Sequence, residues 1–461
     1  MINSTETICA LSTATGGALG IIRISGPDTF SIVSALCSVP CETVAANTIH
    51  YTHIVEPLAV HQQQVPAVID EAMVAVFKSP HSYTGEDCVE ISCHGSRYIL
   101  NKVLELLVRQ GCRMAEPGEF TKRAYLNGKM DLSQAEAVAD LIASSNRATH
   151  HMAMSQLRGH FSSQLTKLRD QLLQLTSLLE LELDFSDHED LEFADRTELL
   201  RLAVTIDECI STLAHSFQTG QALKKGIPVA IIGKTNVGKS TLLNKLLRDE
   251  RAIVSDIHGT TRDTIEDTID LHGASFRFID TAGIRQTDDA IEQIGIDRTF
   301  QAIDRAQIVL WLIDTVPSDD EQKAIAARCK GKNLIIIANK SDKGALIDEQ
   351  AVTIPHSSFI SISAKFGTNL NLLEKTIYEA ADLPEISEND IIVTNARHYQ
   401  ALLRAHEDLS QVITGLQDQL PGDLLAEDLR MVLSTLADIT GGQITPQETL
   451  NTIFSHFCIG K

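Results

Sequence analysis

The residues Gly-Lys-Thr-Asn-Val-Gly-Lys-Ser at 233–240 constrain this chain more than any other stretch. They fit the pattern G-x-x-x-x-G-K-[ST] and stand between an apolar run at 227–232 and a helix-like segment at 241–247, the context that the pattern requires. The two glycines let backbone N–H groups turn onto an anion, and the helix N-terminus adds partial positive charge. Lys239 offers a full charge for the outer phosphates, and Ser240 offers a hydroxyl for magnesium. The loop therefore predicts a nucleotide phosphate site on a strand-to-helix turn.

Three short motifs follow, each after a strand-like run. The segment 280–283 (Asp-Thr-Ala-Gly) offers an acid that can hold magnesium through water and a glycine N–H that can contact a γ-phosphate. The segment 339–342 (Asn-Lys-Ser-Asp) ends in an aspartate that can accept hydrogen bonds from the N1–H and exocyclic amine of guanine. The segment 363–365 (Ser-Ala-Lys) offers a backbone amide to guanine O6. In this order the motifs resemble the GTPase superfamily signature and predict GTP rather than ATP.

Length and composition limit the remaining possibilities. The 461 residues suggest ~3 domains, and 43% hydrophobic with 22% charged residues is ordinary for a soluble protein. We expect no membrane span, because no apolar run reaches the ~18 residues that a span needs, and no signal peptide, because no basic segment followed by an apolar one opens the sequence. Nine cysteines without C-x-x-C spacing indicate a reduced, cytoplasmic setting without a zinc site. The net charge of −22 argues against broad nonspecific nucleic-acid binding but leaves room for a local basic groove.

Residues 1–125 predict an α/β module. Strand-like runs lie at 7–10, 20–26, 71–77 and 88–95, and a helix is expected at 99–110, where apolar residues recur at helical spacing before Gly111. Arg23 and Glu90 fall on two of these strands, and alternation alone favours surface positions for both.

Helical segments flank the central motifs on both sides. In residues 126–220 we expect helices at 131–142, at 153–183 as one long helix, and at 199–218, and in residues 385–461 at 397–415, 424–440 and 445–457. The acidic stretch 184–195 offers metal ligands, but a solvated loop is the favoured interpretation.

Residues 221–384 alternate strands and helices, which predicts a mostly parallel, Ras-like sheet. The expected fold is thus multidomain: an N-terminal α/β domain, and an all-α bundle built from two chain segments into which the GTPase domain is inserted.

Three further stretches are distinctive: 82–87 (Ser-Tyr-Thr-Gly-Glu-Asp), 117–129 (Pro-Gly-Glu-Phe-Thr-Lys-Arg-Ala-Tyr-Leu-Asn-Gly-Lys) and the ending 454–461 (Phe-Ser-His-Phe-Cys-Ile-Gly-Lys). With the central motifs, they make essentially the whole chain resemble the MnmE (TrmE) family of tRNA-modification GTPases. The resemblance implies that residues 1–125 bind a tetrahydrofolate (5-formyl or methylene) and form a homodimer. It also implies work with an FAD-dependent partner of the MnmG (GidA) type in a heterotetramer, which adds a carboxymethylaminomethyl or aminomethyl group to C5 of the wobble uridine of certain tRNAs.

The family's site residues map onto this sequence. The folate positions would be Arg23, Glu90, Lys129 and Lys461, and Cys458 would be either a nucleophile or an inert, buried thiol. The GTP-binding positions would be Gly233, Asn236, Val237, Gly238, Lys239, Ser240, Thr241, Ser255, Thr260, Thr261, Asp280, Thr281, Ala282, Gly283, Asn339, Lys340, Asp342, Ser363, Ala364 and Lys365.

Hydrolysis needs an explanation of its own, because Ile284 stands where Ras-like GTPases keep a water-orienting glutamine. No arginine finger can be assigned, but the carboxamide oxygen of Asn236 could hold a monovalent cation beside the phosphates. The resemblance implies that this cation is K⁺. The other ligands of K⁺ would be Ser255, Ile257 and Thr260, and Mg²⁺ would be bound by Ser240 and Thr261. Glu292 would orient the attacking water, and the other catalytic residues would be Lys239 and Asn236.

Two other classes of function fit parts of the sequence. A regulatory GTPase switch in ribosome assembly, as in proteins of the Der or Era type, would share the central domain but lack the N-terminal module and the Cys-Ile-Gly-Lys ending. An ATP-dependent motor conflicts with the guanine-reading segment 339–342.

Overall fold

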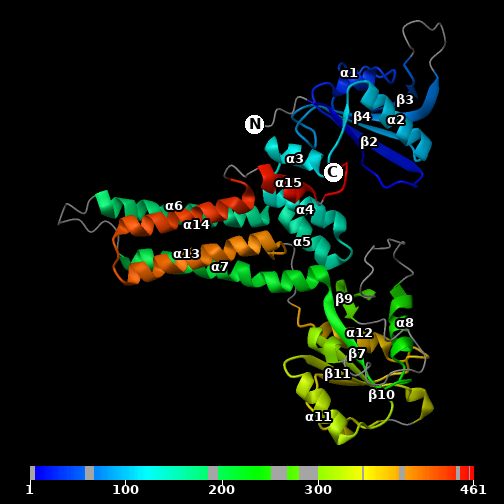
Figure 1. Cartoon of the computed structure of the whole chain (residues 1–461), viewed down its shortest axis with the longest axis vertical. Helices are drawn as coiled ribbons and strands as arrows, with labels where there is room; N and C mark the ends of the chain where they lie inside the picture. Colours follow the sequence, from blue (N-terminus) through cyan, green and yellow to red (C-terminus); the bar gives the residue numbers. More distant parts are fainter. Residues whose placement is uncertain are drawn as a thin grey trace. The chain divides into compact units, whose positions relative to one another are not determined.

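We describe the chain from a computed structural model, shown in Figure 1. The structure describes residues 6–57, 67–184, 196–250, 267–279, 300–344, 347–383, 390–442, 447–455 and 457–460. Its contacts define two compact units. The first comprises Met1–Ala143, Gln156–Ile206 and Glu407–Lys461, and the second comprises Ser144–Ser155 and Asp207–His406.

The first unit contains a mostly antiparallel sheet. Its strands run in the order β3-β4-β5-β2-β1-β6, and only β1 and β6 pair in parallel. Helix α2 packs its buried leucine and valine side chains against Ile22 and Ile24 of β2, which alternate with less buried residues. The strands are β1 (Ile8–Leu11), β2 (Leu19–Ser25), β3 (Thr48–Val55), β4 (Val68–Phe77), β5 (Cys88–His94) and β6 (Arg113–Met114), and the helices are α1 (Thr29–Ser34) and α2 (Arg97–Arg109). The four strands and the helix expected here are confirmed, whereas β3 and β6 were not predicted.

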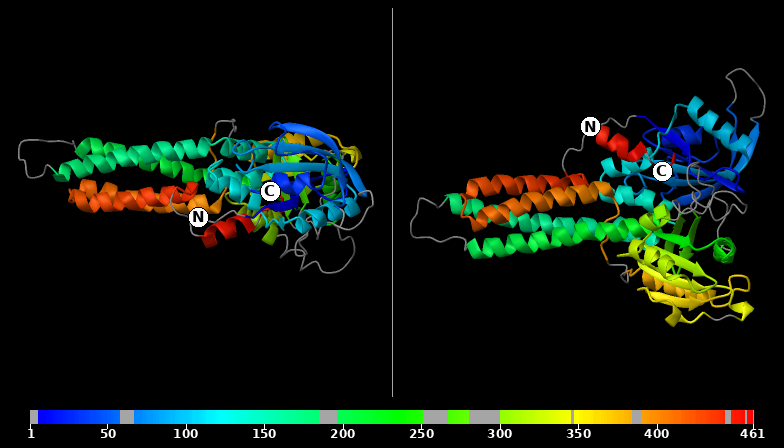
Figure 2. Two further views of the ribbon diagram at one scale, coloured as in Figure 1. Left: turned by 90° about the horizontal axis from the view of Figure 1, so that it is seen from above. Right: turned by 60° about the horizontal axis from the view of Figure 1, so that its bottom comes forward.

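The helical part is built from both segments that flank the nucleotide domain. Helix α6 packs against α14, a pairing that Figure 2 shows in green and red-orange. Helices α7 and α13 also contact each other, because Phe217 stacks on Tyr399 with ring centroids 4.2 Å apart. The helices are α3 (Glu119–Leu126), α4 (Leu132–Ala143), α5 (Arg147–Leu157), α6 (His160–Asp184), α7 (Arg196–Lys225), α13 (Ala396–Gln417), α14 (Gly422–Thr440) and α15 (Gln447–Ser455). The expected bundle of two chain segments is thus observed.

The single long helix expected at 153–183 is wrong. Gly159 adopts the left-handed conformation (φ +84°), so α5 ends before it and α6 begins after it. The N–H of Ser163 donates to the carbonyl of Gly159 at 2.8 Å in the first turn of the second helix. A single glycine therefore separates two helices that the apolar pattern predicts as one.

The second unit contains the nucleotide-binding sheet. Its strands run in the order β12-β11-β10-β7-β9-β8, and all pairs are parallel except β8 with β9, which confirms the mostly parallel sheet. Side chains of β10 alternate between two hydrophobic clusters, so both faces of the sheet are covered. The elements are β7 (Ile227–Ile232), α8 (Lys239–Glu250), β8 (Asp267–Leu271), β9 (Ala274–Ile279), β10 (Ile308–Ile313), α11 (Asp319–Arg328), β11 (Asn333–Ala338), β12 (Ser358–Ser361) and α12 (Leu370–Ala380).

Helix α5 packs against this sheet, although helices α6 and α7 lie between α5 and the sheet in the sequence. The N–H of Ala148 donates to the carbonyl of Gly273 in the β8–β9 turn at 3.1 Å. The side chain of Asn146 donates from Nδ2 to Ser275 Oγ at 2.6 Å, and both residues are buried. Met152 joins the hydrophobic cluster beneath the sheet. The hairpin β8–β9 is therefore held by a helix that lies outside the segment 221–384.

Candidate nucleotide-binding site

The phosphate loop can be built only with glycine at its two ends. Gly233 has φ +144°, and a Cβ there would lie 2.4 Å from the carbonyl oxygen of Leu312. Gly238 has φ +104°, and a Cβ there would lie 2.3 Å from Asn339 Nδ2. Any larger residue would push the loop away from the strands that support it. The sequence pattern thus has a steric cause in this fold.

Lys239 begins α8 and folds back over the loop. Its Nζ donates to the carbonyl oxygens of Gly233 and Lys234, each at 2.7 Å. Burial lowers the pKa of Lys239. An anion at the loop would offset that desolvation, so this ammonium group is suited to phosphate oxygens. Ser240 and Thr241 follow in the first turn of α8, beside the same loop.

Asn236 lies at the turn of the loop in the left-handed conformation, with φ +61°. This conformation is uncommon outside glycine, and asparagine is one of the residues that tolerate it best. In phosphate loops this turn faces the bound phosphate chain. The backbone that carries the Asn236 carboxamide therefore lies next to the expected position of the phosphates.

Asn339 connects three of the motifs. Its Nδ2 donates to the carbonyl of Val237 in the phosphate loop at 2.8 Å, and its Oδ1 accepts from the N–H of Ala364 at 3.0 Å. The residue is only 7% exposed. Because both amide atoms have described partners, Asn339 acts as a strut between the phosphate loop and the segment 363–365.

Asp342 is oriented by the neighbouring motif. Its Oδ1 accepts a hydrogen bond from Ser363 Oγ at 2.7 Å, and this bond lowers the pKa of Asp342. The N–H of Ser341 donates to the carbonyl of Ile362 at 3.1 Å. The carboxylate is thus held ionised at the C-terminal edge of a parallel sheet, where such folds bind ligands. Lys365 completes this corner, with Nζ 5.1 Å from the centroid of the Phe366 ring.

Ten of the expected site residues lie outside the described residues. They are Ser255, Ile257, Thr260, Thr261, Asp280, Thr281, Ala282, Gly283, Glu292 and Lys461. The acidic stretch 185–195 also lies outside them. Among the described residues, no group of three or more His, Cys, Asp or Glu side chains is arranged to hold a metal. The remaining residues expected to bind GTP are brought together around the phosphate loop and the ends of β11 and β12.

Arg23 and Glu90 form a second, separate candidate site on the N-terminal sheet. They are directly opposite each other on β2 and β5, and Arg23 Nε donates to Glu90 Oε1 at 2.8 Å. The guanidinium carbon of Arg23 lies 5.1 Å from the Tyr83 ring centroid and 5.6 Å from that of Phe120. The side chains are 14% and 26% exposed, so the expectation of ordinary surface charges is wrong. Alternation alone could not reveal the aromatic residues that cover the pair.

The end of the chain reaches this N-terminal site, as expected. The carbonyl of Gly460 accepts from Ser12 Oγ at 3.2 Å and from Arg23 Nη1 at 3.4 Å. Cys458 is exposed, so the interpretation of it as a buried thiol is wrong. Its carbonyl accepts from the N–H of Gly118 at 3.4 Å. Lys129, the remaining described folate candidate, donates from Nζ to the carbonyl of Pro80 at 3.0 Å.

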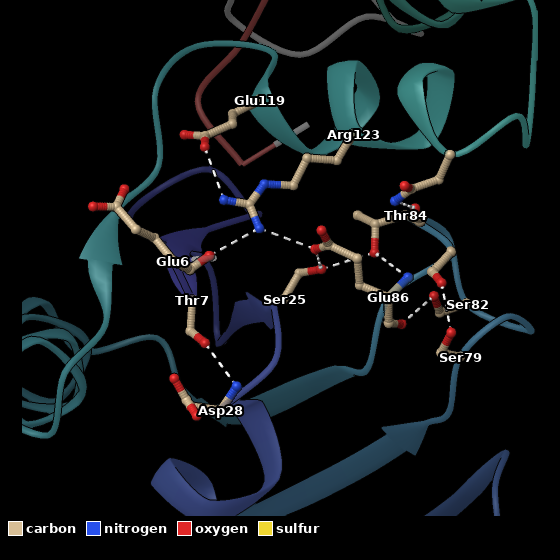
Figure 3. Close-up of polar contacts among 12 residues, drawn as sticks. Glu6, Thr7, Ser25, Asp28, Ser79, Ser82, Thr84, Glu86, Glu119 and Arg123 are labelled. Carbon is tan, nitrogen blue, oxygen red and sulfur yellow. Dashed lines mark hydrogen bonds and ion pairs between the residues drawn. The ribbon is translucent and has the colours of Figure 1, made fainter. Parts of the chain in front are cut away.

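The distinctive stretches 82–87 and 117–129 meet at Arg123, which sequence reasoning did not single out (Figure 3). Arg123 is 5% exposed and donates to Glu86 Oε2 and to the carbonyl of Glu6, each at 3.0 Å. It also donates to Glu119 Oε1 at 3.1 Å, and Ser25 Oγ donates to Glu86 Oε2 at 2.8 Å. A buried arginine with three partners fixes helix α3 against the sheet beside Arg23. The two stretches therefore support the N-terminal site.

The parallel sheet, its phosphate loop and the anchored guanine-reading segments define a GTP-binding protein of the phosphate-loop class. The family model described as "MnmE helical domain" matches residues 132–458, and the model "GTP-binding protein TrmE N-terminus" matches residues 7–129. The chain belongs to the MnmE family of tRNA modification GTPases.

Full-length relatives agree with this assignment. The protein called "tRNA modification GTPase MnmE" from Phocaeicola vulgatus is 53% identical over 499 residues, covering 100% of both chains. The protein of the same name from Bacteroides thetaiotaomicron is 52% identical and covers 99% of both. Among solved structures, a GTP-binding protein from Sulfolobus solfataricus in complex with GDP matches 47% of this chain and 67% of its own at 19% identity, with a TM-score of 0.25. That structural likeness is too low to support an argument. Every helix in the described part of the chain is too short or too polar to cross a membrane.

Proposed function

We propose that this chain is a potassium-activated GTPase of tRNA wobble-uridine modification. With an FAD-dependent partner of the MnmG type, it would add a carboxymethylaminomethyl or aminomethyl group to C5 of that uridine, using a folate one-carbon unit. The observation that carries the proposal is the coupling of a phosphate loop, through Asn339, to a carboxylate held for guanine. Membership of the MnmE family over the full length favours this role over a regulatory switch in ribosome assembly.

In the GTPase reaction, water attacks the γ-phosphorus, and charge grows on the phosphoryl oxygens and on the leaving β-phosphate. Lys239 is suited to neutralise part of that charge, because its ammonium group already lies over the phosphate loop. Ser240 and Thr261 would bind Mg²⁺, which would supply further positive charge to the phosphate oxygens. Of this set, Ser240 is at the start of α8, as magnesium binding from a phosphate loop requires.

The potassium proposal rests on Asn236. A carboxamide oxygen is a suitable ligand for an alkali cation, and the left-handed backbone of Asn236 lies within the phosphate loop. Ser255, Ile257 and Thr260 would complete the ligand set, and Glu292 would orient the attacking water; these roles rest on the family resemblance. A cation there would supply the positive charge that other GTPases take from an arginine.

The folate proposal rests on the pair Arg23 and Glu90. A pterin ring carries hydrogen-bond donors that suit a carboxylate, and its flat face suits the partly exposed aromatic ring of Tyr83 near the guanidinium. Lys129 and Lys461 would meet the anionic glutamate tail of 5-formyl- or methylene-tetrahydrofolate. Cys458 remains a candidate nucleophile, because it is exposed.

We also propose a cytoplasmic homodimer that joins its partner in a heterotetramer. Ile49, Tyr51 and Met73 support the homodimer, because they expose 64%, 61% and 43% of their surface on one face of β3 and β4, where Tyr51 pairs with Met73. The four segments 1–125, 126–220, 221–384 and 385–461 would serve as the folate and dimer domain, helical part, GTPase domain and second helical part.

Two measurements test this proposal separately. GTP turnover in potassium salts should exceed turnover in sodium salts, and Asn236→Ala should remove the difference while the exposed helix variant Asn244→Ala keeps it. Equal rates in both salts would reject the cation role. Nucleoside analysis of tRNA from cells lacking the protein should show an unmodified wobble uridine, and an unchanged uridine would reject the modification role while leaving the GTPase intact.

A further inference from the structure

We propose that Asp314 is a positioning residue for guanine nucleotides: it holds the ammonium group of Lys340 at the base-recognition corner before a nucleotide binds. This inference rests on the proposed GTPase function. No motif contains Asp314, which directly follows β10.

The two residues meet because neighbouring parallel strands end together. Ile313 of β10 pairs with Ala338 of β11, so both strands leave the sheet at the same edge. Lys340 then adopts the left-handed conformation, with φ +66° and ψ +34°. This turn brings its Nζ to 2.6 Å from Asp314 Oδ2. A non-glycine residue in this conformation is held by its surroundings, and the ion pair is part of them.

Each residue of the segment 339–342 has its own anchor outside the segment. Asn339 bonds Val237 and Ala364, the N–H of Ser341 bonds Ile362, and Asp342 bonds Ser363. Asp314 supplies the corresponding anchor for Lys340. Without Asp314, the side chain of Lys340 would have no described contact outside the segment 339–342.

The ion pair contributes little to folding, which points to a role in binding. Both side chains are 30% exposed, and pairs of this kind add little to stability. A preorganised lysine, by contrast, loses less side-chain entropy when a ligand packs along it. With its ammonium group held at Asp314, the aliphatic stem of Lys340 is available to a flat, apolar ring face, such as that of a purine.

Asp314 is directed to Lys340 rather than to the other nearby lysine. A small cavity beside the phosphate loop is lined by Asp314, Val237, Lys234 and Glu321 among others. The Nζ of Lys234 is bound there to Glu321 Oε2 at 2.8 Å. Two separate ion pairs thus flank this side of the loop, and the one at Asp314 belongs to the base-reading segment.

The test uses the full chain and compares Asp314→Asn with Asp304→Asn. Asp304 pairs with Arg328 at 3.4 Å on the same domain and touches no nucleotide motif, so it controls for the loss of one exposed ion pair. We expect Asp314→Asn to raise the dissociation constant of GDP roughly tenfold, because the freed Lys340 side chain would lose rotamer freedom when the base packs along it. Asp304→Asn should leave it unchanged, and the unfolding temperature without nucleotide should be the same for both variants.

Two further readouts separate positioning from general damage. Inosine diphosphate lacks the exocyclic amine of GDP. Because Lys340 would contact the ring face and not the amine, Asp314→Asn should weaken the binding of both nucleotides by the same factor. In a double-mutant cycle, Asp314→Asn should add nothing to Lys340→Met, and Asp314→Glu should partly restore affinity.

Unchanged or tighter GDP binding in Asp314→Asn, or full additivity with Lys340→Met, would overturn the proposal. None of these outcomes would touch the GTPase assignment, since that is decided by the turnover of the unaltered protein.

Discussion

At the scale of single residues, the candidate site depends on side chains that hold other residues. Asn339, Ser363 and Arg123 each bond to residues of another motif and hold it in place. The motifs predict that Asn339 and Ser363 contact the ligand, whereas the side chains of both already make hydrogen bonds within the protein. Their substitution should therefore change stability as well as binding.

Asn339→Ala should destabilise the fold by about 1–3 kcal/mol, because the carbonyl of Val237 and the N–H of Ala364 would be left without their partner in a buried place. GDP binding should weaken in the same variant. Denaturant unfolding and a GDP titration measure the two effects, with the exposed Asn244→Ala as control. Weaker GDP binding at unchanged stability would show that Asn339 is a direct ligand instead of a strut.

Asp342→Asn should change the choice of base. A carboxylate accepts from the N1–H and amine of guanine, whereas an amide offers a donor to the C2 carbonyl of xanthine. GDP affinity should therefore fall by about tenfold or more and xanthosine diphosphate affinity should rise. Competition titrations with both nucleotides check this. A loss of affinity for both would mean that the substitution displaced Ser363 rather than changed the recognised edge.

At the scale of elements, helix α5 is the unexpected part of the nucleotide-binding unit. Asn146 accepts from the N–H of Thr149 at 2.8 Å, which caps α5, and also donates to Ser275 of β9. One side chain thus starts the helix and fixes it to the strand that ends directly before residue 280.

Ser275→Ala and Asn146→Ala should separate these two roles. Ser275→Ala removes the buried bond alone and should cost about 1–2 kcal/mol, whereas Asn146→Ala also removes the cap and should cost about 1 kcal/mol more. Thermal and denaturant unfolding of the full chain provide the measurement, with Ser358→Ala on β12 as control. Equal costs for the two variants would mean that the cap contributes nothing.

Much of this scale could be predicted, since most strands and helices with regular apolar spacing were placed within a few residues, although α7 continues to Lys225, beyond the expected end at 218. Strand β3 was missed because Ile49 and Tyr51 lie on its exposed face while Thr52 is buried, which reverses the usual pattern. The break at Gly159 was missed because the apolar repeat continues across it. Contacts such as Arg23 with Glu90, or Asp314 with Lys340, depend on strand register between distant segments, and local patterns carry no information about it.

At the scale of the whole molecule, the two ends of the chain meet in the first unit. The motifs of the phosphate loop are local in sequence and were therefore predictable, whereas the N-terminal site combines residues 12, 23, 90 and 460. Only the family resemblance indicated that the last residues return to the first strands.

Gly460→Ala should weaken folate binding without affecting GTP. Gly460 has φ +93°, and a Cβ there would lie 2.3 Å from the carbonyl oxygen of Leu11, so the tail must move away from Arg23. Calorimetry with 5-formyltetrahydrofolate should show reduced affinity, and GDP affinity should be unchanged. Gly442→Ala is the matched control, because its nearest neighbours lie 3.7 Å away. Undiminished folate binding would show that the tail is no part of that site.

The contact of Gly460 with Ser12 and Arg23 also sets an order of events during synthesis. Domains fold as the ribosome releases them, beginning with the N-terminal one. The N-terminal sheet can form early, but its polar pair must wait for residue 460, which leaves the ribosome hundreds of codons later. The part of the protein that is translated first is therefore the part that is finished last.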